Sequence, residues 1–426
     1  MLLHYWIRFL ASLKHGSRYA RAFLRWTLYA GVTGIIGGFV GMAFHASVEW
    51  ATEAREAHEY FLYFLPVAGI IIVGLYNAFN SYEDNSTDTV VRYTRHDGRT
   101  VPLALAPLIF ISTVLTHLCG GSAGREGAAL QLGGSIATQV GYWFGVDKKE
   151  MRVLLMCGMS ALFSALFGTP VTAIFFALEV SFVGIMQYSA LIPCIVASVI
   201  AYIITQINGI EPTRFVLANT PQITSSTMLL TVALAALCGI LSIFFCRAIH
   251  RTEHLMHRIK NDYLRIIIGA FIIIALTKIV GNGDYNGAGM NIITRAVEGG
   301  DAKTFAFLLK ILFTVVTIAA GFKGGEIVPT LFIGATFGCV FGKLVGMDAG
   351  VCAAVGMIAM FCGVLNCPLA SIFLSIELFG AQGLMLFVIA VGVSYMFSGY
   401  SGLYGSQKIM SSKLRARYVN KHIAKQ

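Results

Sequence analysis

The segment CGMSALFSALFGTPVTAIFFALE at residues 157–179 recurs 198 positions later as VGMIAMFCGVLNCPLASIFLSIE at residues 355–377. Eight of the 23 aligned positions are identical, and they include a proline and the final glutamate, which an apolar bias alone would not reproduce. Upstream, at an offset of 200, three more pairs coincide: Gly124 with Gly324, Glu126 with Glu326, and Gly134 with Gly334. The sequence therefore predicts an internal duplication. A duplicated membrane fold places its substrate site between the repeats near the midplane, and the sequence leaves open whether the repeats are inverted or parallel.

The composition indicates a protein embedded in a membrane. Hydrophobic residues make up 57% of the 426 residues and charged residues 12%, whereas a soluble domain carries about 25% charged residues. These values exclude a water-soluble globular protein, a disordered chain and a fibrous repeat. The stretches without Asp, Glu, Lys or Arg differ widely in length, and the chain contains 45 glycines. We therefore expect an all-α polytopic membrane protein with many tilted helices of unequal length, some of them broken inside the membrane.

The distribution of charge predicts how the chain is oriented. The formal net charge is +10, from 31 Lys and Arg against 21 Asp and Glu. Basic residues cluster in 1–26, 247–265 and 408–426, whereas Arg214 is the single basic residue of 208–226. Because cytoplasmic segments are enriched in Lys and Arg, we expect a multi-pass protein of the cell (inner) membrane with both termini in the cytoplasm. The basic clusters then have a topological cause, and we expect no nucleic-acid partner.

These features divide the chain into five segments. We predict a cytoplasmic amphipathic lead-in at 1–26, a first membrane repeat at 27–207, an external loop at 208–226, a second membrane repeat at 227–407 and a basic cytoplasmic tail at 408–426. The lead-in has no small-residue cleavage site after its basic residues, so we interpret it as a helix rather than a signal peptide. The nine cysteines lie in apolar stretches without CxxC spacing, and we expect them to be buried rather than disulfide-bonded or metal-bound.

Two glycine-rich acidic segments are the best candidates for a functional site. They are GGSAGREGAALQLGG at 120–134 and GFKGGEIVPTLFIGATFG at 321–338. Glycines allow backbone N–H groups to point into a cavity, and a helix that follows adds the positive end of its dipole. Together they can bind an anion without a lysine. Their recurrence in both repeats is typical of a midplane site made by broken helices.

A glutamate in such a segment has a specific meaning. The carboxylate of Glu126 is itself an anion, so it can occupy the place of a free anion, and once protonated it is neutral and can leave. One group would thus compete with the anion and carry a proton, which is the minimum needed for anion/proton exchange. An ionisable side chain inside a membrane is costly and is a functional candidate by default. The same reasoning applies to Glu326, although either glutamate could instead cap its helix, and Glu126 could pair with Arg125.

Other residues allow weaker interpretations. Glu179 and Glu377 end their apolar helices at matched positions, which favours a structural role over a proton relay. Tyr404 precedes the basic tail, where most tyrosines are interfacial, but its hydroxyl could also serve a site. GNGDYNG at 281–287 contains the GxGD pattern of intramembrane aspartyl proteases, yet its Gly and Asn density favours a turn, and such an enzyme needs a second membrane aspartate.

The segments GSAGREGAALQLGGSIA and GGEIVPTLFIGATFG resemble those of the CLC family of chloride channels and anion/proton antiporters, and the resemblance covers about residues 27–410. It implies a homodimer with one pore per subunit and two halves of opposite topology. It identifies Glu126 with the family's external gating glutamate. It also aligns 325–329 with the segment whose backbone amides bind the central anion, and Tyr404 with the pore tyrosine.

Departures from the family pattern point to one branch. Ala128 replaces a proline after GREG, and GFKGGE with a glutamate at 326 resembles the fluoride/proton antiporters of the family, which carry an extra glutamate in the anion pathway. That branch often has threonine where this chain has Val328. The first selectivity motif of the chloride branch would fall within Asn85–Thr89, without a fixed register. Val180 stands where chloride antiporters have an internal proton-transfer glutamate, which argues against conventional chloride/proton exchange.

We therefore expect a secondary active transporter that exports fluoride in exchange for protons, or alternatively a chloride/proton antiporter or a passive anion channel of the same fold. We expect no enzyme activity and no cofactor or metal; the expected partners are fluoride or chloride, protons, the lipid bilayer and a second copy of the chain. Glu126 and Glu326 are the candidates for gating and proton coupling. The candidates for anion binding are Gly124, Arg125, Gly127, Gly325, Ile327, Val328 and Tyr404.

Overall fold

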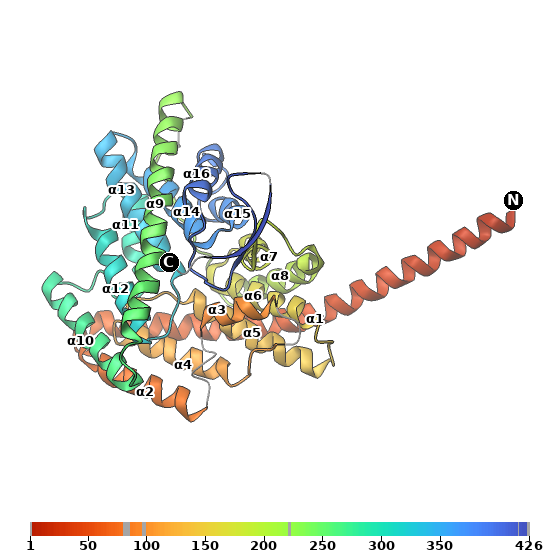
Figure 1. The fold of residues 1–426 in the computed structure, drawn as a ribbon, viewed down its shortest axis with the longest axis horizontal. Coiled ribbons are helices and arrows are strands. Elements are labelled where there is room, and N and C mark those ends of the chain that lie inside the picture. The colour runs from red at the N-terminus through yellow and green to blue at the C-terminus, as the bar shows by residue number, and fades with distance from the viewer. Residues whose placement is uncertain (1, 80–85, 96–98, 220–222, 416, 424–426) are drawn as a thin grey trace.

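The computed structural model describes residues 2–79, 86–95, 99–219, 223–415 and 417–423. In these residues the chain forms sixteen α-helices, two 3-10 helices and three short strands (Figure 1). The expectation of an all-α membrane fold is therefore confirmed, apart from a small sheet.

The helices fall into two sets of eight. The first set is α1 (Leu2–Ala57), α2 (Leu65–Ala78), α3 (Thr87–Tyr93), α4 (Leu105–Leu118), α5 (Glu126–Trp143), α6 (Met151–Phe167), α7 (Pro170–Glu179) and α8 (Leu191–Ile207), with the 3-10 helices η1 (Glu59–Phe64) and η2 (Tyr188–Ala190). The second set is α9 (Ser225–Met256), α10 (Asp262–Val280), α11 (Met290–Glu298), α12 (Ala306–Ala320), α13 (Ile327–Val345), α14 (Ala349–Leu365), α15 (Pro368–Phe379) and α16 (Leu384–Phe397). The same order of long and short helices in both sets is what a duplication predicts.

The helices differ in length as the sequence predicted. Six helical segments are long and apolar enough to cross a membrane: Tyr19–Ala57, Glu59–Ala78, Tyr188–Ile207, Ser225–Met256, Asp262–Val280 and Ile327–Val345. Seven other apolar helices have between 10 and 17 residues, too few to span about 30 Å of hydrocarbon. The first helix continues without a break through the predicted boundary at residue 26, and its N-terminal end projects away from the other helices (Figure 1).

Equivalent elements of the two repeats contact each other directly. The carboxylate of Glu377, at the end of α15, accepts hydrogen bonds from the first backbone amides of α7, and the carboxylate of Glu179, at the end of α7, accepts them from the first amides of α15. Between them, the rings of Phe175 and Phe373 stack at 4.3 Å. Such reciprocal contacts arise when two halves are related by a twofold rotation. The structural interpretation of the two glutamates agrees with these contacts.

The short helices have clear causes in the sequence. The chain leaves α6 through Gly168 (φ 67°) and leaves α14 through Asn366 (φ 57°), both in the left-handed conformation that ends helices. Two residues later Pro170 and Pro368 begin α7 and α15, because proline is pre-organised for the first turn of a helix. The two breaks therefore follow the matched GTP and NCP triplets.

Close glycine contacts hold the broken helices at the centre. A Cβ on Gly133 of α5 would overlap the carbonyl oxygen of Gly158 on α6, and a Cβ on Gly334 of α13 would overlap that of Gly356 on α14. The described residues of α14 are buried around the whole helix. A helix that is apolar on all sides is a core helix, and α14 is one despite being too short to span a membrane alone.

A small sheet fixes the C-terminal segment. Strand β2 (Lys408–Ser411) pairs in parallel with β1 (Phe182–Val183), which follows α7, and antiparallel with β3 (Tyr418–His422). The sequence analysis predicted a basic tail here and no strands. The pairing ties the end of the chain to the first repeat, next to the end of α7.

Candidate functional site

The two glycine-rich segments meet at the centre of the molecule. The backbone N–H of Gly124 donates to the carbonyl oxygen of Gly325 at 2.6 Å, and the N–H of Gly325 donates to Gly124 at 2.7 Å, as an isolated antiparallel bridge. A Cβ on Gly127 would lie 2.9 Å from the Cα of Gly325, so only glycine permits this approach. The bridge brings the N-terminal ends of α5 and α13 together, as the duplicated motif predicted.

The bridge also corrects the alignment of the two acids. Gly124 pairs with Gly325, and Gly133 is structurally equivalent to Gly334, so the true offset here is 201 and not 200. At this offset Glu326 is equivalent to Arg125. Both are the N-cap residues of their helices, with nearly equal backbone angles of φ −98°, ψ −6° and φ −108°, ψ −11°. The expectation that Glu126 and Glu326 occupy equivalent positions is therefore wrong by one residue. An alignment of two apolar, glycine-rich repeats can be shifted by one position and still show matching residues.

Glu126 is buried among backbone amides. Its side chain is 1% exposed, it is the first residue of α5, and its Oε2 accepts a hydrogen bond from the N–H of Arg125 at 3.0 Å. The amides of Glu126 itself and of Val328 also act on this carboxylate. Because unpaired N–H groups and the helix dipole both favour a negative charge at a helix N-terminus, the carboxylate lies where an anion would be stabilised.

Arg125 contributes less to this site than an ion pair would suggest. Its Nε is 3.9 Å from Oε1 of Glu126, beyond hydrogen-bond distance, and its Nη2 donates to the carbonyl oxygen of Leu166 at 3.4 Å. The guanidinium is 20% exposed. It therefore supplies positive charge near Glu126 without holding the carboxylate.

The second segment places its residues on two sides of the bridge. Val328 is 2% exposed, and its Cβ would be 3.1 Å from a Cβ on Gly124, so it packs at the bridge near Glu126. Ile327 is fully buried. Glu326 has a carboxylate oxygen, Oε2, that is buried and has no hydrogen-bond partner among the described residues.

Thr87 and Gln131 lie beside the bridge; the sequence analysis left Thr87 in a window without a fixed register and missed Gln131. The hydroxyl of Thr87, the first residue of α3, donates to the carbonyl oxygen of Gly127 at 3.2 Å and accepts from Nε2 of Gln131 at 3.3 Å. Thr87 falls in the predicted window Asn85–Thr89, of which Asn85 lies outside the described residues. Ser86 before it caps α3, and this N-cap signal was the available clue.

Tyr404 lies in the loop after α16 and is 2% exposed. Its hydroxyl has no hydrogen-bond partner in the described part of the chain. The loop is anchored two residues later, where the N–H of Ser406 donates to the carboxylate of Asp88 at 2.7 Å. The structure thus brings Tyr404 to the same region as the two glycine-rich segments.

Two separate cavities reach the bridge. The first, which we call the Glu126 cavity, has about 310 Å³ and is lined by Glu126, Val328, the end of α1, the loop 283–289 and the start of α11. The second, the Glu326 cavity, has about 480 Å³ and is lined by Glu326, the end of α9 and the start of α10. Helix α10 has 19 residues and is therefore about 28 Å long. Asp262 and Arg265 at its start line the Glu326 cavity, and Gly283 and Asp284, which follow its end, line the Glu126 cavity. The two cavities therefore open on opposite sides of the molecule.

The cavities also determine the relation between the repeats. The C-terminal end of α1 lines the Glu126 cavity, and the equivalent end of α9 lines the Glu326 cavity. Equivalent helix ends thus lie on opposite sides, which inverted repeats require and parallel repeats forbid. The alternative that the sequence left open is settled in favour of inversion.

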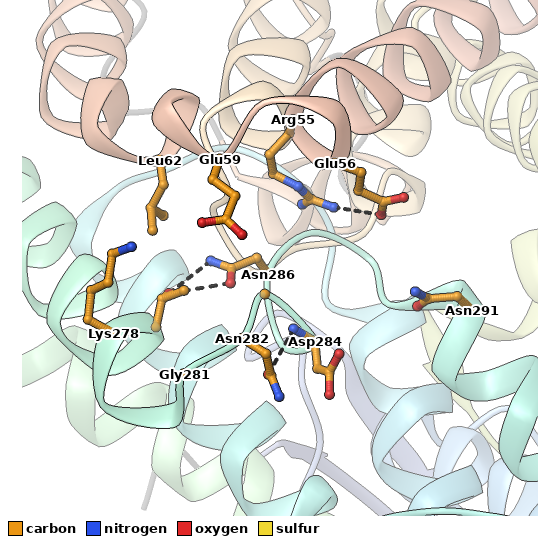
Figure 2. Close-up of a pocket in the computed structure, with 12 residues that line it drawn as sticks. Arg55, Glu56, Glu59, Leu62, Lys278, Gly281, Asn282, Asp284, Asn286 and Asn291 are labelled. Atoms are coloured by element: carbon orange, nitrogen blue, oxygen red, sulfur yellow. Dashed lines mark hydrogen bonds and ion pairs between the residues drawn. The ribbon is translucent and has the colours of Figure 1, made fainter.

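A neighbouring pocket adjoins the Glu126 cavity. Figure 2 shows Arg55 and Glu56 at the end of α1 facing the loop that carries Asn286. The side chain of Asn286 fixes this loop by donating to the carbonyl oxygen of Gly120 at 2.6 Å. Asp284, the acid of the GxGD pattern, is 27% exposed and pairs with Lys303 at 2.7 Å. A partly exposed, lysine-paired acid in a turn does not resemble one of two acids sharing a proton.

His117 is a further buried group that the sequence analysis did not identify. It is fully buried, lines the Glu126 cavity, and its Nε2 lies 3.3 Å from the carbonyl oxygen of Gly124. Because a carbonyl can only accept, this nitrogen carries the proton in the neutral ring. All nine cysteines are free and buried, as expected. Among the described residues no group of three or more His, Cys, Asp or Glu side chains could hold a metal ion.

Comparison with known proteins agrees with this architecture. The family model described as voltage gated chloride channel matches residues 68–399. A chloride/fluoride channel protein of Pseudomonas syringae pv. tomato is 34% identical over 91% of this chain and 87% of the relative. An H(+)/Cl(-) exchange transporter ClcA of Citrobacter koseri is 26% identical over 89% and 87%, respectively.

Solved structures give the same result. The crystal structure of a CLC-type fluoride/proton antiporter superposes with a TM-score of 0.87 at 33% identity, covering 90% of this chain and 98% of that chain. A slow cyanobacterial Cl-/H+ antiporter superposes with a TM-score of 0.74 at 20% identity, covering 88% and 94%, and this second likeness concerns the fold alone.

Proposed function

Because the chain belongs to the voltage gated chloride channel family, we propose that it is a secondary active transporter that exports fluoride in exchange for protons. The similar protein of Pseudomonas syringae is named for chloride and fluoride, and the similar crystal structure is that of a fluoride/proton antiporter. These relatives transport ions and are not enzymes, and we propose the same for this chain.

The observation that carries this proposal is the position of the Glu126 carboxylate. It lies at the N-terminus of α5, accepts a backbone N–H and reaches the Glu126 cavity. A hydrogen bond to a charged group contributes about 1.5–3 kcal/mol, so a fluoride ion in the same place would gain comparable stabilisation. Carboxylate and fluoride therefore compete for one set of donors.

The exchange follows from this competition. A proton from the Glu126 cavity neutralises the carboxylate, the neutral group leaves the amides, and fluoride arriving from the Glu326 cavity takes its place. When the group loses its proton toward the Glu326 cavity and returns, fluoride is displaced into the Glu126 cavity. One proton thus moves opposite to the anion. Glu126 carries the coupling, and Glu326 shares the proton as the second member of a coupled pair.

The anion-binding groups are drawn from both repeats. We assign the backbone amides of the segments that hold Gly124, Gly127, Gly325, Ile327 and Val328, the hydroxyl of Tyr404 and the charge of Arg125. Fluoride is small and strongly hydrated, so several donors must replace its water. The unpartnered hydroxyl of Tyr404 and the buried bridge support this assignment.

The chain is a multi-pass membrane protein, and we place it in the cell (inner) membrane with both termini in the cytoplasm. On this orientation the Glu326 cavity faces the cytoplasm, since Glu253, His257, Asp262 and Arg265 of the basic segment 247–265 line it. We also propose a homodimer, which the mass of the purified protein in detergent would test.

The deciding experiment is reconstitution into liposomes with a fluoride-selective electrode and simultaneous pH recording. We expect fluoride efflux to drive proton uptake, and Glu126→Gln to abolish this coupling. Wild-type coupling in Glu126→Gln would refute the mechanism.

The second candidate function is chloride/proton exchange or passive anion conduction, which the similarity to an H(+)/Cl(-) exchange transporter favours. The same recording with chloride in place of fluoride separates the candidates. Chloride-driven proton movement at an equal rate would favour exchange of chloride, and anion flux without a pH change would favour a channel.

A further inference from the structure

The Glu326 cavity connects a buried acid with an accessible one. Glu326 lies at its deep end beside the glycine bridge, and Glu253 and His257, at the end of α9, line its other end. The side chain of Glu253 is 40% exposed, and His257 is exposed. The cavity therefore leads from the centre of the molecule to solvent.

Two hydrogen-bond acceptors without partners face this cavity. The hydroxyl of Thr87 donates to Gly127, so it must accept from Gln131, which places the amide nitrogen of Gln131 toward Thr87. The amide oxygen of Gln131 is left without a partner, although this side chain is 98% buried (2% exposed). Oε2 of Glu326 also has no partner among the described residues. Two buried acceptors lining one cavity call for a shared donor.

The two oxygen atoms lack a hydrogen-bond donor. Either a proton bound to Glu326 or a water molecule that takes up this proton would supply one. An amide oxygen and an ionised carboxylate only accept hydrogen bonds. A water held between Oε2 of Glu326 and the oxygen of Gln131 would satisfy both atoms. The cavity of about 480 Å³ has room for such a water and for others toward Glu253.

The charges around Glu326 favour a proton there. The groups that face it come from every element packed around it. They are Glu253 and His250 on α9, Asp88 on α3, Lys323 in the preceding loop, Asp262 and Arg265 on α10, and Tyr404. Arg265 pairs with Asp262 at 2.6 Å, Nδ1 of His250 lies 3.7 Å from the carboxylate of Glu253, and Lys323 lies over the ring of Tyr76 at 4.7 Å.

Val180 cannot carry a proton. It follows α7 directly, is fully buried, and has no group that could bind a proton. Glu179, next to it in the chain, and Glu377 are held by the amides of the partner helices. Neither lines the Glu326 cavity.

We propose that the Glu326 cavity is the proton route between the central site and the cytoplasm. The protonated Glu326 breaks its O–H bond and transfers the proton to the water held with Gln131. The resulting hydronium passes the proton along the cavity to the carboxylate of Glu253, which releases it to solvent, so that one proton moves and no other bond changes. Gln131 is a positioning residue here. The proposal rests on the proposed fluoride/proton exchange and adds the path that the proton takes.

The test compares three variants in proteoliposomes. Gln131→Leu removes the amide that holds the water, and Glu253→Gln removes the acid at the mouth, where a substitution leaves the packed interior intact. Glu150→Gln is the matched control, because Glu150 is also a partly exposed, ion-paired acid, 2.6 Å from Arg25, but does not line the cavity. Proton and fluoride fluxes are measured together at several cytoplasmic pH values, and fluoride binding is measured by calorimetry.

We expect Gln131→Leu and Glu253→Gln each to lower proton flux by at least about tenfold, as loss of a positioned proton carrier does. In Glu253→Gln the fluoride affinity should stay at the wild-type value and the dependence of proton flux on cytoplasmic pH should flatten, and Glu150→Gln should behave as wild type. Wild-type proton flux in Glu253→Gln would overturn the route. A parallel loss of fluoride affinity and proton flux in Glu253→Gln would also overturn it, because Glu253 would then act on the anion and not on the proton alone. If the wild-type protein itself moves no fluoride, the proposed function fails first, and the route fails with it.

Discussion

The exchange of helix caps between Glu179 and Glu377 predicts an unequal effect of removing either charge. Glu377 accepts hydrogen bonds from the N–H of Val171 at 2.9 Å, from the N–H of Thr172 at 2.8 Å and from the Thr172 hydroxyl at 2.6 Å. Glu179 accepts two longer ones, from Leu369 at 3.3 Å and Ala370 at 3.0 Å. The substitution Glu377→Gln should therefore destabilise the protein more than Glu179→Gln.

The size of the loss in stability follows from the backbone N–H groups that the glutamine side chain would face in each variant. A glutamine keeps one accepting oxygen and turns an NH₂ group toward an N–H that needs an acceptor. Glu377→Gln thus loses at least one charge-assisted hydrogen bond of about 1.5–3 kcal/mol and leaves a partly buried N–H unpaired. We expect a loss of about 2–3 kcal/mol in the free energy of unfolding. For Glu179→Gln, whose bonds are longer, we expect about 1–2 kcal/mol.

The assay pairs stability with transport. Unfolding midpoints in detergent should fall in the order wild type, Glu179→Gln, Glu377→Gln, and the double variant should fall by less than the sum because the two caps share one interface. The ratio of protons to fluoride moved should not change in any of them. A lost ratio with an unchanged midpoint in Glu179→Gln would refute the structural interpretation and make this residue a proton relay.

Three other predictions concern packing, the anion site and the tail. Gly158→Ala should prevent correct folding, because a Cβ there would overlap the carbonyl oxygen of Gly133. A Cβ on Gly392 would have no atom within 4 Å, so Gly392→Ala should leave stability unchanged or raise it by about 0.5–1 kcal/mol. Expression levels and unfolding midpoints compare the two variants. Val328→Thr should add a hydroxyl donor beside Gly124 and strengthen fluoride binding by about 1 kcal/mol in calorimetry, and weaker binding would place the anion elsewhere. Burial lowers the pKa of Lys413 to about 8 in the folded protein, so the unfolded chain binds the proton more tightly and stability should rise with pH from about 8 to 10; this rise should be smaller in Lys413→Met.

The duplication explains how much of this structure the sequence could predict. The matched segments predicted two equivalent repeats, and the matched Pro170 and Pro368 predicted where the breaks between helices lie. The glycines of the two acidic segments were correctly expected to meet, because only a residue without a side chain permits the bridge between Gly124 and Gly325. The sequence could thus predict those features that a glycine or a proline within a short stretch of the chain determines.

The remaining parts depend on contacts between distant residues. Thr87 and Gln131 are 44 positions apart, and neither motif marks them, since threonine and glutamine are ordinary in such stretches. The strands β1 and β2 are separated by more than two hundred residues and are too short to show an alternating pattern. The hydrogen bond between Ser406 and Asp88, which fixes the loop of Tyr404, likewise has no local signal.

The shift of one residue between the two acids has a consequence for transport. Inversion places Arg125 and Glu326 at equivalent positions on opposite sides of the bridge, so the fold itself is symmetric while the charges there are opposite. An anion near the Glu126 cavity meets a guanidinium, and one near the Glu326 cavity meets a carboxylate unless this group is protonated. A fluoride ion can therefore pass Glu326 at low cost only when a proton is present there. On the proposed exchange, anion and proton are linked at Glu326 as well as at Glu126, and an exchanger needs such a link on both sides to avoid a leak.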